Sequence, residues 1–168
     1  MSVVESTRAL QHVAIVLTAF VGLSIPAEGQ VPVSPNSIAG IWILNLAKST
    51  YEPGPAPYKR STCRIEPLGE SLKVTYDMVG IRGGVTHIEW VGKLDGKDYP
   101  IQGIDDVLTN AYTRIDDRTY EVVVKADGAK AATARIVVAP DGKTLTSVTS
   151  TRNAQGQTLK TTTVYDRK

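Results

Sequence analysis

The side chains of this 168-residue sequence that could perform acid–base chemistry gather in two neighbouring β-prone runs. His87 and Glu89 stand two residues apart, and Asp77 lies in the preceding run. Residues two apart in a strand share a face, so a His–Glu pair could act as general acid and base. The same alternation allows the pair to face solvent while Ile88 and Trp90 point inward. The sequence leaves both placements open.

Other reactive residue types do not form recognisable sites. Cys63 is the single cysteine, so no intramolecular disulfide can form, and we expect a half-buried strand residue. Cys63 and His87 stand too far apart in sequence to indicate a zinc site, and no metal or cofactor is predicted. The pairs Asp105–Asp106 and Asp116–Asp117 are expected to form turns, because neighbouring strand residues point in opposite directions.

The N-terminal region resembles a targeting segment more than part of a folded domain. Arg8 precedes an apolar run from His12 to Ile25, and Ala27 and Gly29 form a small-x-small site. This pattern is typical of a secretory signal peptide and predicts a secreted or periplasmic protein, with a buried or anchoring helix as the alternative. The run is short for a stable membrane span. The predicted organisation is a signal peptide over 1–29, a linker over 30–37 and one domain over 38–168.

The charge of the chain argues against a nucleic-acid partner. The formal net charge is +2 at pH 7, and Lys and Arg do not form a cluster in the sequence. Proteins that bind nucleic acids usually concentrate basic residues on one face or stripe. The expected partner is a small hydrophobic molecule, and the sequence does not indicate an oligomeric state.

The remaining sequence predicts an all-β fold. Runs rich in Val, Ile, Thr and Tyr alternate with turn residues such as Asp95–Gly96, Asp127–Gly128 and Asp141–Gly142. Short connections favour an antiparallel meander, and closure removes the sticky edges of a long open sheet. We predict a single up-and-down β-barrel of about eight to ten strands. The candidate strands are 39–46, 61–66, 71–79, 85–93, 98–102, 106–115, 119–126, 131–139, 143–151 and 157–166.

Strand alternation also gives a predicted inner face that could contact an apolar ligand. On three strands, large apolar residues share one face and charged or hydroxyl-bearing residues share the other. Arg114 is included because it could pair with an anionic ligand group, although the opposite face of its strand is nearly as apolar. The candidate ligand contacts are Trp42, Leu72, Val74, Tyr76, Met78, Ile88, Trp90, Leu108, Tyr112, Arg114, Tyr120, Ala134 and Ile136.

Two segments differ from the general pattern. The runs 143–152 and 157–165 are crowded with Thr and Ser, which indicates either a hollow interior with small polar lining or surface threonines chosen for β-propensity. The connection 47–60 is long and contains Pro53, Pro55 and Pro57. It is predicted to be either a lid over one barrel mouth or a structural strap.

The opening of the domain resembles a known family of barrels. Gly40-x-Trp42 resembles the motif that begins lipocalins and fatty-acid-binding proteins, the calycins, and Lys48-Ser49-x-Tyr51 is similar to the fatty-acid-binding branch. The resemblance implies a ligand-holding barrel in which a basic residue near the C-terminus packs across the Trp ring, with Arg152 and Arg167 as candidates. The Pro-rich connection replaces the two helices of that branch. The chain also lacks its Arg-x-Tyr device for gripping a carboxylate.

The chain also resembles a group of exported bacterial proteins of unassigned function. The shared motifs lie at Trp42–Ser49, Pro53–Pro57, Asp95–Pro100 and Asp141–Thr146, and this resemblance implies no activity.

Three functions are compatible with the sequence. The leading one is an exported lipocalin-like protein that binds a small, largely apolar ligand without catalysis. The second is a barrel enzyme, such as an isomerase, cyclase or hydratase, that uses His87 with Glu89 or Asp77 on a hydrophobic substrate. The third is a solid β-sandwich that acts as an envelope interaction module.

Overall fold

The computed structural model describes residues 37–52 and 54–168. The predicted signal peptide over 1–29 and nearly all of the predicted linker over 30–37 lie outside the described residues. The elements, in chain order, are β1 (Gly40–Leu44), η1 (Leu46–Lys48), β2 (Thr50–Tyr51), β3 (Tyr58–Leu68), β4 (Ser71–Gly80), β5 (Val85–Gly92), β6 (Tyr99–Gln102), β7 (Leu108–Arg114), β8 (Thr119–Ala126), β9 (Ala129–Val138), β10 (Thr144–Arg152) and β11 (Thr158–Arg167).

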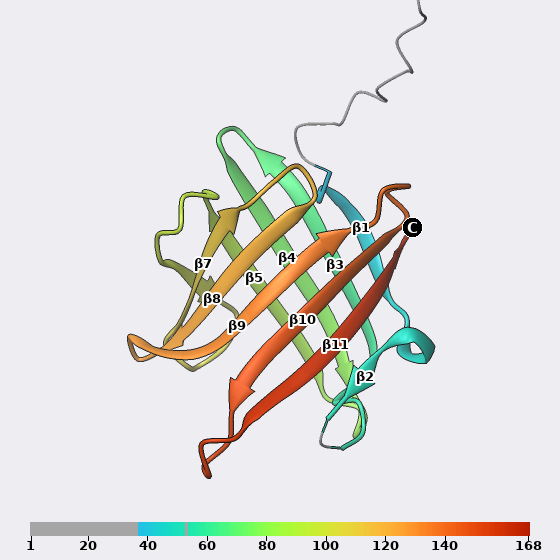
Figure 1. Ribbon diagram of the computed structural model, residues 1–168, viewed down its shortest axis with the longest axis vertical. Helices are drawn as coiled ribbons and strands as arrows, with labels where there is room; N and C mark the ends of the chain where they lie inside the picture. Colours follow the sequence, from blue (N-terminus) through green and yellow to red (C-terminus); the bar gives the residue numbers. More distant parts are fainter. Residues whose placement is uncertain (1–36, 53) are drawn as a thin grey trace, which may run out of the picture. The chain divides into compact units, whose positions relative to one another are not determined.

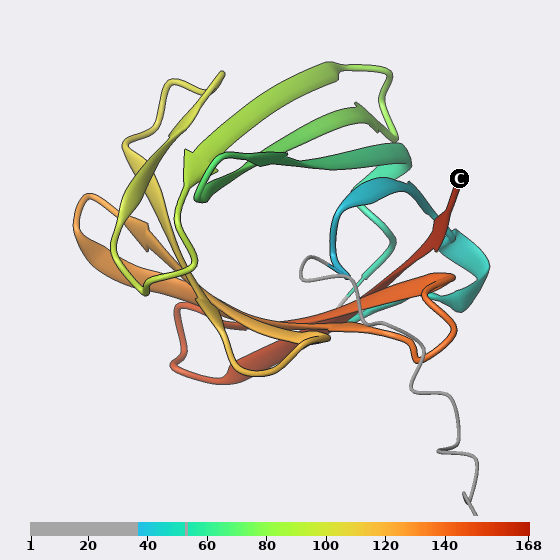
Figure 2. The same cartoon turned by 90° about the horizontal axis from the view of Figure 1, so that it is seen from above.

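The strands form one closed antiparallel barrel. From β3 to β11 each strand pairs with the next in sequence, β1 pairs with β3, and β1 also pairs with β11, so ten strands complete the ring (Figure 1). The short β2 continues the line of β1 along β11 after the 3-10 turn η1. Figure 2 shows the ring from above, with β3–β5 in one wall and β8–β11 in the opposite wall. The predicted up-and-down barrel is therefore confirmed, and the solid sandwich is excluded.

All ten predicted strands are present, with boundaries that differ by three residues or fewer. The prediction missed β2, which lies within the expected loop 47–60, and η1, which begins at the last residue of the predicted strand 39–46. The weakest part of the wall is β6, which is paired through only two residues with β5 and two with β7.

One end of the barrel is sealed by Trp42 and the residues around it. Ile38 and Trp42 are fully buried, and Trp42 Nε1 donates a hydrogen bond to the Ile38 carbonyl at 2.9 Å. The guanidinium of Arg167 lies 4.2 Å from the centroid of the Trp42 ring, a cation–π contact. It also donates to the carbonyls of Ser37, Ala39 and Gly142. The basic partner expected for the Trp is thus Arg167 and not Arg152.

The glycine of the G-x-W motif has a packing role at this end. Gly40 has a φ of +146°, and a Cβ built on it would lie 2.4 Å from Arg167 Nη1. Any larger residue would therefore displace the guanidinium from the ring, in addition to straining the backbone. Gly40, Trp42 and Arg167 form one unit, the closed end of the barrel.

The core fills the part of the interior next to the closed end. In neighbouring strands, Trp42 is in register with Cys63, Cys63 with Tyr76, and Tyr76 with Ile88, so these residues share the inner face. Trp90 packs against Tyr112 with ring centroids 4.4 Å apart. Cys63 is only 3% exposed, and not half-buried as expected, because its position beside Trp42 places it in this layer.

Candidate functional site

The opposite end of the barrel contains a cavity of about 450 Å³, which we call the mouth cavity. It lies between the inner faces of β10 and β11 on one side and the Pro-rich segment that joins β2 to β3 on the other. Its lining is mostly apolar or hydroxyl-bearing, with one charged residue, Glu52. The lining residues are Leu44, Tyr51, Glu52, Pro55, Pro57, Tyr58, Thr149, Thr151, Leu159, Thr161, Thr163 and Tyr165.

The threonines of the last two strands divide between the two faces of the wall. Thr149 is in register with Thr161, and Thr161 with Tyr51, and all three line the mouth cavity. Their neighbours Val148 and Lys160 line a hollow on the outer surface. Both interpretations of the Thr-rich runs are therefore partly right: alternate residues line the cavity, and the others cover the surface. An inward threonine offers a methyl group for apolar contact and a hydroxyl for a ligand's polar atom.

The Pro-rich segment is attached to the barrel at both of its ends. On one side, β2 pairs with β11. The turn before β2 is bound to β11 as well, because Asn45 Nδ2 and Lys48 Nζ donate hydrogen bonds to the Asp166 carboxylate at 2.6 and 2.9 Å. These contacts lower the pKa of the Asp166 carboxyl. On the other side, the Pro57 carbonyl accepts a hydrogen bond from the backbone N–H of Ile81 at 3.2 Å. This attachment makes the segment part of the cavity wall.

The deep end of the mouth cavity meets a layer of buried hydroxyl and thiol groups. Tyr165 lines the cavity, and Ser61, Cys63 and Tyr76 lie near it in the interior. Burial raises the pKa of the Cys63 thiol to about 12, with a hydrogen bond to Tyr76 acting in the opposite direction. Burial likewise raises the pKa of Tyr76, Tyr112 and Tyr165 well above the usual tyrosine value. All four groups are therefore neutral hydrogen-bonding groups near pH 7.

A second, small space lies beyond this layer, between β4, β5, β6 and β7. It measures about 20 Å³, and Tyr76, Trp90, Asn110 and Tyr112 are among its lining residues. Asn110 Oδ1 is buried and has no hydrogen-bond partner within the described part of the chain. A space of this size holds one water molecule, which would give the amide oxygen a donor.

Most of the predicted ligand contacts lie in the packed core. Ten of them lie in the buried core or pack against it. They are Trp42, Leu72, Val74, Tyr76, Met78, Trp90, Tyr112, Tyr120, Ala134 and Ile136. Ile88 lines the small space, and Leu108 is half-buried at the start of β7. None of these residues lines the mouth cavity. The predicted inner face is thus largely sealed by packing near the closed end.

Arg114 does not serve as a free cation in the interior. Its guanidinium makes a 2.5 Å ion pair with Asp117 and donates to the Asp116 carbonyl at 3.2 Å, near the β7–β8 turn. The pairing of Arg114 with an anionic ligand group stays a prediction, and in this structure the guanidinium is already bound by residues of its own hairpin.

The candidate acid–base residues lie on the outer wall. His87 Nδ1 and Asp77 Oδ1 are 2.7 Å apart, with 57% and 61% of their side chains exposed. Glu89 forms a 2.7 Å ion pair with Lys73 on the same outer surface. The two alternatives left open by strand alternation are thus resolved in favour of the outward placement, and none of these groups faces the mouth cavity.

Several cavity residues were missed by the sequence analysis, chiefly Tyr51, Tyr58, Leu159 and Tyr165. Tyr165 carried a usable signal, because it stands two residues before Arg167 and shares its strand face. Tyr51 and Tyr58 flank the prolines in a segment that was predicted to be a loop, and strand alternation does not assign an inner or outer face to loop residues.

Neither a metal centre nor a membrane helix is found within 37–52 and 54–168. The described side chains include no group of three or more His, Cys, Asp or Glu that could hold a metal ion. In the same part of the chain, no helix has the length and apolar character needed to cross a bilayer.

Comparison with known proteins relates the chain to ligand-binding barrels by structure alone. No protein-family model matches the sequence, and no curated protein matches it either. A zebrafish ileal bile acid-binding protein complexed with cholic acid aligns with a TM-score of 0.50 and 11% identity, over 79% of this chain and all of that one. The siderocalin Ex-FABP aligns with a TM-score of 0.45 and 15% identity, over 79% of this chain and 71% of that one. The closed ten-stranded meander and the first of these alignments together show that this chain has a calycin-like β-barrel fold.

Proposed function

We propose that this protein binds a small, largely apolar molecule in the mouth cavity. The observation that carries the proposal is a cavity of about 450 Å³ inside a barrel whose other end is sealed. Sites for small molecules usually measure about 300–1,000 Å³ and combine an apolar lining with a few polar groups. Leu44, Leu159 and the tyrosine and proline rings supply the apolar surface, and the inward threonines supply the polar groups.

The placement of the ionisable groups favours binding over catalysis. A barrel enzyme of the kind considered above needs an acid or base that reaches the substrate. His87, Asp77 and Glu89 lie on the outer wall, and the buried tyrosines and Cys63 hold their protons near neutral pH. Glu52 is the one charged residue of the lining, and no His, Lys, Arg, Cys or second carboxylate lines the mouth cavity beside it.

The proposal includes export of the protein before it binds its ligand. It is supported by the signal-peptide pattern over 1–29. Detection of the protein in the periplasm or medium of its host, with an N-terminus near residue 30, would test this part.

Binding can be tested with a matched pair of variants at neighbouring positions of β10. Thr149 lines the mouth cavity, whereas Val148 is 36% exposed on the outer wall. Thr149→Phe fills part of the cavity, and Val148→Phe makes a comparable change outside it. We expect Nile red, a neutral lipophilic dye, to bind the native protein and Val148→Phe alike, and Thr149→Phe at least tenfold more weakly.

Native mass spectrometry of protein purified from its host provides a second test. We expect a co-purifying small molecule that is lost from Thr149→Phe. A clean ligand-free species, together with no response to a panel of lipophilic compounds, would refute the proposed function.

A further inference from the structure

The outer surface of the β8–β11 wall carries a groove that lies across the sheet from the mouth cavity. Two hollows of about 390 and 410 Å³ open on this surface, and they meet because Thr133 and Ser150 line both. Ser150 and Lys160 alternate along their strands with Thr149 and Thr161, which line the mouth cavity, so the wall separates the two spaces. We call the two hollows together the outer groove.

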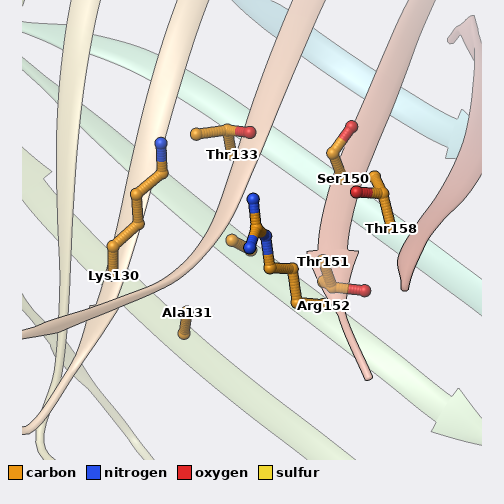
Figure 3. Close-up of a pocket in the computed structure, with 8 residues that line it drawn as sticks. Lys130, Ala131, Thr133, Ser150, Thr151, Arg152 and Thr158 are labelled. Carbon is orange, nitrogen blue, oxygen red and sulfur yellow. The ribbon is translucent and has the colours of Figure 1, made fainter. Parts of the chain in front are cut away.

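The cations of the outer groove come from neighbouring strands and reach its floor. Lys160 is in register with Ser150, and Ser150 is in register with Thr133. Lys130 lies at the start of β9 and Arg152 at the end of β10. Both of these side chains extend toward the region between Thr133 and Ser150 (Figure 3). They therefore lie in the groove and do not project away from it.

Three cations of the outer groove are electrostatically uncompensated. Lys130, Arg152 and Lys160 are exposed and make no ion pair within the part of the chain that the structure describes. Arg135, the remaining cation of the lining, pairs at 3.0 Å with Glu121, the one carboxylate of the lining. Uncompensated cations produce a positive potential, and an anionic partner can lower that potential without displacing an existing one.

The charge of this wall differs from that of the opposite wall. The paired outward positions of β3, β4 and β5 carry equal numbers of cations and carboxylates, namely Arg60, Arg64 and Lys73 with Glu66, Asp77 and Glu89. The paired outward positions of β8–β11 carry one carboxylate, Glu121, and the cations Lys125, Lys130, Arg135, Arg152 and Lys160. Because these cations come from four strands, the sequence shows no basic cluster, yet the folded wall is strongly positive.

The lining of the outer groove suits an extended peptide. The hydroxyl groups of Thr133, Ser150 and Thr158 can both donate and accept hydrogen bonds, as the backbone groups of an extended chain require. Val148 is 36% exposed in the groove and offers an apolar contact. The head groups of a flat bilayer would meet the rims of the groove first, whereas an extended chain can enter it and reach the cations on its floor.

We propose that the outer groove binds an extended acidic segment of a partner protein, with Lys130, Arg152 and Lys160 pairing with its carboxylates. The proposal does not depend on ligand binding in the mouth cavity. Each exposed ion pair contributes about fivefold or less to an affinity, and salt screens it. The association is therefore weak and reversible, and the three pairs together produce a preference for acidic sequences.

The test compares two fluorescein-labelled decapeptides, one in which Glu alternates with Thr and one in which Gln alternates with Thr. At pH 7.5 and low ionic strength, we expect fluorescence anisotropy to show the Glu peptide binding the native protein about tenfold more tightly. In K130Q/R152Q/K160Q the preference should disappear, and 0.5 M salt should reduce it in the native protein. Equal binding of the two peptides, or no binding of either, would overturn the proposal.

A charge-matched variant separates the groove from general attraction. Arg60 and Arg64 are exposed on β3, and Arg82 is exposed in the turn between β4 and β5. R60Q/R64Q/R82Q therefore removes the same charge away from the groove and should keep the preference for the Glu peptide. A loss equal to that in K130Q/R152Q/K160Q would show that net charge alone attracts the peptide, and the proposal would fail.

A second variant tests the shape of the groove without changing its charge. Ser150→Phe fills the place where the two hollows meet, and we expect it to weaken binding of the Glu peptide about tenfold. Cooperative unfolding in urea checks that each variant is folded. Unchanged peptide binding by folded Ser150→Phe would contradict insertion of the peptide into the groove.

Vesicles distinguish an acidic peptide from an anionic lipid surface. We expect the protein to sediment no more with an equal mixture of phosphatidylglycerol and phosphatidylcholine than with phosphatidylcholine alone. Sedimentation with the anionic vesicles that is lost in K130Q/R152Q/K160Q and kept in Ser150→Phe would assign the wall to a bilayer and overturn the peptide proposal.

Discussion

The two ends of this barrel are built from the same strands and have opposite properties. At the closed end, β11 contributes Arg167, and the interior is packed around the fully buried Trp42. At the open end, the same strand contributes Leu159, Thr161 and Thr163, and the interior contains the mouth cavity. The β10–β11 ladder continues without a register shift between the two ends, so along these strands the difference lies in the side chains.

This difference shows how one regular sheet can provide both stability and a binding site. Large side chains bring the interior to normal packing density and exclude water. Small hydroxyl-bearing side chains keep the same β geometry and leave room for a ligand. Substitutions at the two ends should therefore separate effects on stability from effects on binding.

The largest expected effect is on folding, from truncation at the closed end. Trp42→Ala removes the largest fully buried side chain and should lower the free energy of unfolding by about 3–5 kcal/mol. Thr161→Ala, in the cavity lining, should change it by less than about 1 kcal/mol, because no packed core surrounds the threonine. Urea denaturation measures both values, and similar losses for the two variants would contradict the contrast between the ends.

A second effect on stability is expected at alkaline pH, through Cys63 beside Trp42. Its pKa is about 12 in the folded protein, against an ordinary value of 9.0, so the unfolded chain loses the proton first. Below pH 9 the thiol is protonated in both states, so it does not change the free energy of unfolding. Between pH 9 and 12 the free energy of unfolding should fall by about 1.4 kcal/mol per pH unit because of this group. Buried tyrosines add their own slope in the same direction.

Comparison with Cys63→Ala isolates this contribution, since the tyrosines are common to both proteins. The variant should lose stability less steeply above pH 9 in urea titrations at each pH. Parallel slopes for the two proteins would show that the thiol does not contribute.

The smallest effect concerns Arg167, whose contacts hold the closed end together. Arg167→Lys keeps the positive charge but loses the planar fork that donates to three carbonyls and covers the Trp42 ring. We expect the free energy of unfolding, measured by thermal denaturation, to fall by about 1 kcal/mol, and the affinity for Nile red to stay the same. A reduced dye affinity without a loss of stability would mean that the two ends are coupled.

The strands were predictable because their signals are local. Alternation within β4, β8 and β9 and the Asp–Gly turns are readable in short windows, and from β3 to β11 each strand pairs with the next in sequence. The G-x-W motif also predicted a basic partner, but spacing could not choose between Arg152 and Arg167. That choice depends on the closure between β1 and β11, which joins residues far apart in sequence.

The site was less predictable than the strands. Strand alternation separates inward from outward side chains, but it does not tell how much of the barrel interior the inward side chains occupy. The predicted contacts are mostly inward, yet their bulk fills the closed end, and the cavity lies where threonines and prolines replace that bulk. Arg114 shows the same limit, because its Asp117 partner comes from a turn whose geometry strand periodicity does not describe.

The contacts between the first and the last strand in sequence also constrain the order of folding. Arg167 Nη1 donates to the carbonyl of Ala39, a residue 128 positions earlier, and β1 completes its second edge only with β11. During folding, β1 can pair with β3 locally, but the ring cannot close until β11 pairs with β1. Such long-range pairing is typical of slow folding. A barrel that lacks β11 therefore exposes the edges of both β1 and β10.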